Sequence, residues 1–106
     1  MRMADEKGKR KRRERSYSAD MARRAREELA DITGLEAEGV TALEQEDDGT
    51  WRVTVELLEL SRVPETDDML GSYEVELDED GEIIGYRRLR RYARSQADRA
   101  QPAQGK

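Results

Sequence analysis

A strict alternation of apolar and polar residues after Trp51 constrains the fold more than any other feature of this sequence. The apolar members are Trp51, Val53, Val55 and Leu57, and polar residues separate them. Successive side chains on a strand point to opposite faces, so this pattern predicts a β-strand with one buried and one wet face. The alternation slips at Leu57-Leu58, which predicts a bulge or a strong bend.

The same period of two recurs on both sides of this strand. Residues 40–46 form a candidate strand, and Asp48-Gly49 is a typical hairpin turn. After a long connection at 62–70, in which Pro64 ends the preceding strand, residues 73–78 alternate again. Asp80-Gly81 then marks a second hairpin that leads into a last strand over 82–92.

The register of this second hairpin has two possible values. A two-residue turn at Glu79-Asp80 pairs Tyr73 with Tyr86 and Val75 with Ile84. A three-residue turn with a left-handed Gly81 shifts the pairing by one residue and exposes Ile84 and Tyr86 instead. We favour the first register because it buries more apolar area.

A helical period precedes the strands, over Ser18 to Thr33. The apolar stripe consists of Ala22, Ala25, Leu29 and Ile32, with Met21 at its border. Ser18 or Asp20 can cap the first turn, and Gly34 suits the left-handed position after the last turn. The stripe is thin, so we expect it to pack on the sheet rather than on a partner helix.

These elements predict an α+β domain, in which one N-terminal helix packs on a four-stranded antiparallel sheet made of two β-hairpins. We expect three segments: a disordered basic N-terminal arm at 1–17, a single α+β domain at 18–94 and a flexible C-terminal tail at 95–106. The arm is either a solvated tail or a segment that docks on an acidic surface or nucleic acid.

The composition excludes most catalytic and metal-binding chemistry. The 106 residues include no His and no Cys, which removes catalytic triads, thiol nucleophiles, zinc sites with those ligands and disulfides. The acidic turns contain oxygen ligands for a hard cation, but none matches the EF-hand pattern. We predict a protein that is not an enzyme, with no catalytic residue, no cofactor and no metal.

No run of about 18 apolar residues occurs, so we expect no insertion into a membrane. The first residues, Met1 to Lys7, lead into no apolar stretch, so we expect no secretory signal. We therefore predict a cytoplasmic protein.

The net charge of −5 conceals a strong segregation of charge. Residues 1–26 carry 11 basic and 4 acidic residues, 27–82 carry 2 and 20, and 83–106 carry 7 and 1. The three balances are +7, −18 and +6. A chain with such blocks can pair with itself, with copies of itself, or with partners of either sign.

The last strand is the most distinctive basic segment. Its arginines are Arg87, Arg88, Arg90, Arg91 and Arg94, with Tyr86 and Tyr92 beside them. Simple alternation places Arg88 and Arg90 on one face and Arg87 and Arg91 on the other. These side chains either form ion pairs across the strands or bind carboxylates or phosphates of a partner. In the second case we expect Arg90, Arg91 and Arg94 to be the arginines without a partner in the sheet.

From Met21 to Arg94 the sequence resembles the gas vesicle protein O family. The resemblance rests on six segments in order: Ala30-Asp31-Ile32-Thr33-Gly34, Gly39-Val40-Thr41, Gly49-Thr50-Trp51-Arg52-Val53, the stretch from Glu56 to Pro64, the stretch from Tyr73 to Asp78, and the stretch from Gly85 to Tyr92. It implies an accessory factor required for gas vesicle assembly. It implies no catalytic or cofactor residue.

On this resemblance we expect a non-enzymatic factor that binds other gas vesicle proteins. Accessory proteins are the preferred candidates, and shell proteins are the alternative. It would act on no small-molecule substrate and would be cytoplasmic or associated with the vesicle. We predict that the contacts are Arg87, Arg88, Arg90, Arg91 and Arg94, with Tyr92 and Trp51 as apolar anchors. Trp51 also suits the core, since it starts the alternation. The alternative function is a small nucleic-acid-binding or regulatory protein that uses the basic arm and the last strand; the net charge disfavours it.

Overall fold

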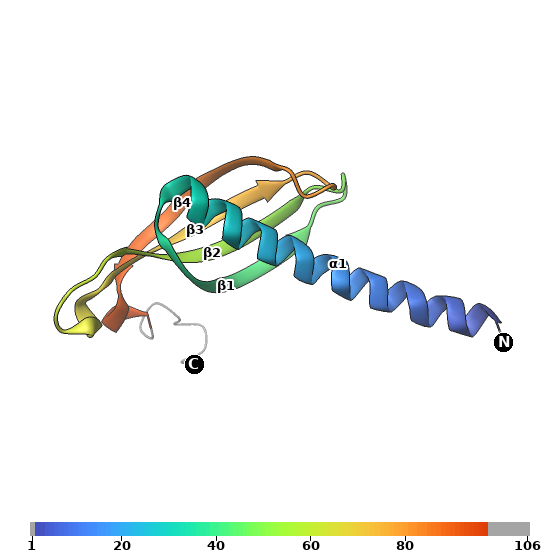
Figure 1. Cartoon of the computed structure of the whole chain (residues 1–106), viewed down its shortest axis with the longest axis horizontal. Coiled ribbons are helices and arrows are strands. Elements are labelled where there is room, and N and C mark those ends of the chain that lie inside the picture. Colours follow the sequence, from blue (N-terminus) through green and yellow to red (C-terminus); the bar gives the residue numbers. More distant parts are fainter. Residues whose placement is uncertain (1, 98–106) are drawn as a thin grey trace.

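The computed structural model describes the backbone of residues 2–97 and the side chains of 17–97. A long helix, α1 (Arg2–Thr33), precedes four strands: β1 (Glu36–Gln45), β2 (Trp51–Leu60), β3 (Met69–Leu77) and β4 (Ile83–Ala93). Two short 3-10 turns, η1 (Glu65–Asp67) and η2 (Arg94–Gln96), lie at one end of the sheet. The strands form one antiparallel sheet in the order β1-β2-β3-β4, and α1 crosses one face of it (Figure 1). The predicted fold class is confirmed.

The helix begins at Arg2, not near Ser18 as predicted. The segment that we expected to be a disordered arm therefore has a helical backbone, and it projects beyond the sheet (Figure 1). Residues 2–17 contain no proline, and eight of the sixteen are Lys or Arg, which favour helix. Apolar periodicity missed them because residues 2–16 include only two apolar residues, Met3 and Ala4. The division into arm, domain and tail stays a prediction, and most of the tail, 98–106, lies outside the described residues.

The core lies between α1 and the sheet. The helix contributes Met21, Ala25 and Leu29, spaced four residues apart, and the sheet contributes Trp51, Val53, Val55, Leu57, Val75 and Leu77. The predicted stripe differs at its ends, because Met21 is buried whereas Ile32 is 49% exposed. The helix therefore packs along a row of residues at i and i+4, which carries Ile32 away from the sheet. No helix in the described part of the chain is long and apolar enough to cross a membrane.

The first two strands pair with several irregularities. β1 begins at Glu36, before the predicted start at Val40, and shifts register on β2 around Glu38 and Thr41. β2 shows the predicted burial of alternate residues. Its own register shift against β3 falls between Leu58 and Leu60, close to the predicted slip. Each shift adds a residue to one strand and increases the local twist.

The register that we favoured for the last hairpin is wrong. Val75 pairs with Tyr86, Leu77 pairs with Ile83, and both Ile84 and Tyr86 are exposed. Gly81 has a φ of 93°, and its amide donates a hydrogen bond to the Asp78 carbonyl over 2.9 Å. A left-handed Gly after a turn produces the bulged hairpin. Local turn geometry therefore outweighed the apolar area that the first register would bury.

Candidate interaction surface

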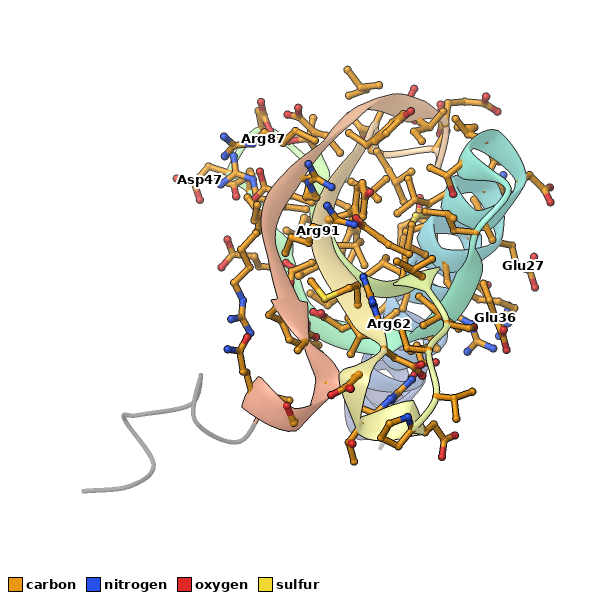
Figure 2. The ribbon with its side chains drawn as sticks, turned by 90° about the vertical axis from the view of Figure 1, so that its left-hand side faces the viewer. Glu27, Glu36, Asp47, Arg62, Arg87 and Arg91 are labelled. Atoms are coloured by element: carbon orange, nitrogen blue, oxygen red, sulfur yellow. The ribbon has the colours of Figure 1, made fainter. Side chains whose placement is uncertain are left out.

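Strand β4 forms one free edge of the sheet and carries four of the five predicted contact arginines. Every residue from Tyr86 to Arg91 is exposed, and β4 pairs only with β3. Figure 2 shows β4 on the side of the molecule away from α1, with Arg87 and Arg91 labelled along it. We call Arg87, Arg88, Arg90 and Arg91, with the exposed Ile84, Tyr86 and Leu89, the basic edge.

The structure distributes the arginines over the two faces differently from simple alternation. Arg88 pairs with Tyr73 and Arg90 with Ser72, so Leu89 is an extra residue in β4. This irregularity puts Arg88 and Arg91 on the helix side of the sheet, and Arg87 and Arg90 on the open side. The predicted pairing of faces was wrong because no signal in the sequence marks the bulge.

On the helix side, two arginines share one carboxylate. Arg88 Nη1 and Arg91 Nε each lie 3.0 Å from Glu59 Oε1, and the Tyr73 hydroxyl donates a hydrogen bond to Glu59 Oε2 over 2.6 Å. The Glu59 side chain is only 8% exposed. Burial raises the pKa of this carboxyl, but the hydrogen bonds from Tyr73 and Arg88 and the charges of both arginines together lower it below its usual value. Glu59 is therefore a structural anion that balances one of two cations.

On the open side, a second carboxylate is shared. Arg87 Nη2 lies 3.1 Å from Glu74 Oε1, and Arg52 Nε lies 3.6 Å from Glu74 Oε2. The Arg87 side chain is 72% exposed, so this ion pair is well hydrated and adds little stability.

Arg90 and Tyr92 interact through the aromatic ring. The guanidinium carbon of Arg90 lies 4.1 Å from the ring centroid of Tyr92, a cation–π contact. Tyr92 itself is buried, and its hydroxyl donates to Glu56 Oε1 over 2.6 Å. Burial and this hydrogen bond raise the pKa of Tyr92 to about 12. The exposed tyrosine of the strand is Tyr86, which was not among the predicted contact residues.

Trp51 packs in the core, which is the second of the two roles considered for it. It is 6% exposed, and Tyr17 meets it edge-on with 5.9 Å between ring centroids. Its indole nitrogen is buried without a hydrogen-bond partner among the described residues. As placed, the ring stabilises the contact between α1 and β2 rather than an outer surface.

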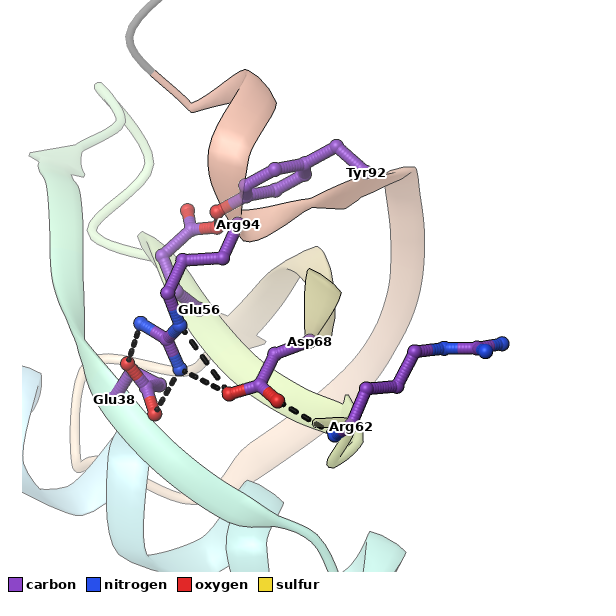
Figure 3. A network of polar contacts seen from close by, with 6 residues as sticks. All are labelled: Glu38, Glu56, Arg62, Asp68, Tyr92 and Arg94. Carbon is purple, nitrogen blue, oxygen red and sulfur yellow. Dashed lines mark hydrogen bonds and ion pairs between the residues drawn. The ribbon is translucent and has the colours of Figure 1, made fainter. Parts of the chain in front are cut away.

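Arg94 is not free, contrary to the prediction. Its guanidinium donates to both Glu38 oxygens, at 3.0 and 3.2 Å, and lies 3.1 Å from Asp68 Oδ2 (Figure 3). Asp68, buried at 4% exposure, also accepts the Arg62 amide at 2.7 Å. These hydrogen bonds raise the pKa of Arg94 further above its already high usual value. Since Glu38 lies on β1 and Arg94 directly follows β4, this network links the two edges of the sheet.

The acidic turns act as local caps. Asp48 Oδ1 accepts the amide and the hydroxyl of Thr50, and these two hydrogen bonds lower its pKa. Asp78 Oδ1 accepts the amides of Asp80 and Glu82. Among the described residues, no group of three or more Asp or Glu side chains is arranged to hold a metal ion.

The basic edge therefore has more positive charge than its own neighbours balance. Its four arginines meet only two carboxylates, Glu59 and Glu74, and Arg52 also uses the second. Arg90 forms no ion pair with any described side chain. Guanidinium groups next to exposed apolar side chains are suited to binding a protein surface that presents carboxylates.

Comparison with known proteins identifies the family. A family model described as "Gas vesicle synthesis protein GvpO" matches residues 4–98. Gas vesicle protein O of Streptomyces sp. is 56% identical over 73 residues, which is 69% of this chain and 56% of the relative. Gas vesicle protein O of Haloferax mediterranei is 41% identical over 76 residues, or 72% of this chain and 54% of the relative.

Gas vesicle protein O1 of Halobacterium salinarum is 44% identical over 71 residues, which is 67% of this chain and 59% of the relative. The chain thus spans little more than half the length of these three relatives. No solved structure matches. The predicted resemblance is confirmed, and the chain belongs to the family of the gas vesicle synthesis protein GvpO.

Proposed function

We propose that this protein is a non-enzymatic accessory factor in gas vesicle synthesis that acts through protein–protein contacts. The observation that carries the proposal is the basic edge, an exposed strand with four arginines and two neighbouring carboxylates. Membership of the GvpO family supports the biological setting. The partners are other gas vesicle proteins, accessory proteins first, and the protein works in the cytoplasm or on the vesicle.

A protein partner suits the charge distribution better than nucleic acid does. Residues 17–97 contain 10 Arg against 21 Asp and Glu, a balance of −11. Phosphate backbones would meet this negative field together with the carboxylates that lie between the arginines. Among the described side chains of β4, Tyr86 is the only exposed aromatic ring available for stacking on bases. A folded protein can place its carboxylates against individual guanidinium groups.

The proposal is tested by deletion and complementation in a host that forms gas vesicles. Deleting the gene should abolish or strongly reduce the light scattering of intact vesicles, and the wild-type gene should restore it. The variant Arg87→Glu/Arg90→Glu, which reverses charge only on the open face of the basic edge, should restore it poorly. Normal scattering in the deletion strain would refute the role in vesicle synthesis.

A matched control separates the basic edge from total charge. Arg23→Glu/Arg26→Glu changes the charge by the same amount on exposed residues of α1, and it should complement fully. The two variants should also differ when tagged protein is used to retain other gas vesicle proteins from the same host. Equal retention by both variants would place the contact surface outside β4.

A further inference from the structure

Both outer strands of the sheet lack a neighbour on one side. The strand order leaves the outward backbone groups of β1 and β4 without a strand partner, and such edges can pair with another chain. Figure 2 places Glu36, at the start of β1, on the opposite side of the molecule from Arg87 on β4. The label of Asp47, just after the end of β1, lies near Arg87 in the same view, because the sheet is curved.

The two edges carry opposite charges. β1 contains three Glu and no basic residue, whereas β4 contains four Arg and no acidic residue. Glu36 and Glu44 are exposed and form no ion pair with any described side chain. On β4, Arg90 likewise forms no ion pair with any described side chain. The other three arginines share two carboxylates, Glu59 and Glu74.

The faces of the edges also match. On the open side of the sheet β4 presents Arg87 and Arg90, and β1 presents Glu44, which pairs with Arg52 in the register. On the helix side β4 presents the exposed Tyr86 together with Arg88 and Arg91, which already share Glu59, and β1 presents Leu43, which is 36% exposed. A sheet continued from β4 to a second β1 would thus juxtapose opposite charges on the open face and bring Tyr86 near Leu43 on the helix face.

Strand direction allows this continuation. Each strand is antiparallel to its neighbour, so β4 runs opposite to β1, and a translated second copy would extend the same antiparallel pattern. Symmetric pairing of β4 with β4, or of β1 with β1, would instead place like charges against each other. Charge therefore favours a head-to-tail contact over a two-fold dimer.

We propose that copies of this protein associate head to tail, with β4 of one copy pairing antiparallel with β1 of the next. Such a contact uses different surfaces on the two copies and can repeat, so it produces a ladder of oligomers rather than a closed dimer. The inference rests on the proposed role of the basic edge as a contact surface, and it names a second copy as the occupant.

The test uses the purified full chain, without other gas vesicle proteins, in analytical ultracentrifugation over a range of concentrations. The wild-type protein should form species beyond the dimer at low salt and dissociate at high salt, because salt screens the exposed charges. Arg87→Glu/Arg90→Glu and Glu36→Arg/Glu44→Arg should each weaken association at least about tenfold, since each opposes like charges. The control Arg23→Glu/Arg26→Glu should associate like the wild type.

Mixing the two charge-reversed variants gives the decisive result. The reversed, acidic β4 of one variant faces the reversed, basic β1 of the other, so an equimolar mixture should recover association that neither variant shows alone. Circular dichroism checks that each variant is folded. If a reversal unfolds the chain, the milder pair Arg90→Ala and Glu44→Ala should each still weaken association.

Three results would overturn the inference: a wild-type protein that stays monomeric at low salt, a dimer that is insensitive to salt, or folded variants that do not associate when mixed. None of these results would change the outcome of the gene-deletion experiment, which tests the proposed function. Failure of self-association and failure of the proposed function are therefore distinguishable.

Discussion

At the scale of single residues, the contact between Arg94 and Asp68 is the most buried ion pair among the described side chains. The Asp68 side chain is 6% exposed and that of Arg94 is 32% exposed. The carboxylate therefore depends on the Arg94 cation and on the hydrogen bond from the Arg62 amide. Arg94→Met should destabilise the fold by about 2 kcal/mol, because it leaves a buried charge without its cation. The free energy of unfolding in urea measures this loss.

The exposed pair of Arg23 and Asp20 on α1 is the control for this measurement. Its side chains are 59% and 56% exposed, so Arg23→Met should change stability by less than about 0.5 kcal/mol. Equal losses for the two variants would contradict the structural role that we assign to Arg94.

The raised pKa of Tyr92 predicts that the stability of the fold depends on pH in the alkaline range. Its pKa rises from 10.0 to about 12 on folding, so the protonated phenol stabilises the native state. This contribution is complete below pH 10 and is lost as the pH rises to 12. The stability advantage of the wild type over Tyr92→Phe should therefore shrink across this interval. Tyr86→Phe, at an exposed ring, should keep the wild-type profile, and a constant advantage over Tyr92→Phe would disprove the coupling.

At the scale of elements, the turn between β3 and β4 depends on Gly81. Its φ is 93°, and a Cβ at this position would lie 2.8 Å from Arg24 Nε and 3.2 Å from Met21 Cε on α1. Gly81→Ala should destabilise the fold by about 1–2 kcal/mol, through left-handed strain and through this crowding. Gly39→Ala on β1 is the matched control, since a Cβ there meets nothing within 4 Å. Thermal melts of both variants measure the difference. Similar melting temperatures for the two variants would contradict the role that we assign to Gly81 in the turn.

At the scale of the whole molecule, we predict that the first half of α1 is separable from the domain at 18–94. The core begins at Met21, and Tyr17 is the first described side chain that contacts the sheet, through Trp51 and the Glu79 carbonyl. Removing residues 2–15 should lower the helical signal in circular dichroism but change the free energy of unfolding by less than about 1 kcal/mol. A loss of several kcal/mol on truncation would show that the arm packs against the domain, contrary to our prediction of a domain at 18–94.

Several features of the fold were predictable because they depend on local pattern. Alternation over 51–57 predicted β2, and the Asp-Gly pairs predicted both hairpins. Gly34 ends α1 as predicted, with a φ of 75°. The start of α1 and the last register were not predictable in this way. The start of α1 lacks an apolar stripe. The register of the last hairpin depends on a bulged turn, which buries less apolar area but forms hydrogen bonds to the carbonyl and carboxylate of Asp78.

The sequence by itself determined the helix-then-sheet order, the segregation of charge into blocks, and the family, because each depends on residue types and their spacing along the chain. Only the tertiary structure decided which arginines are available. Arg94 and Glu38 are 56 residues apart in sequence, and bulges in β1, β2 and β4 bring such distant partners together. Ion pairing depends on distance in space, so strand curvature and register gave Arg94 two carboxylate partners and left Arg90 with none among the described side chains.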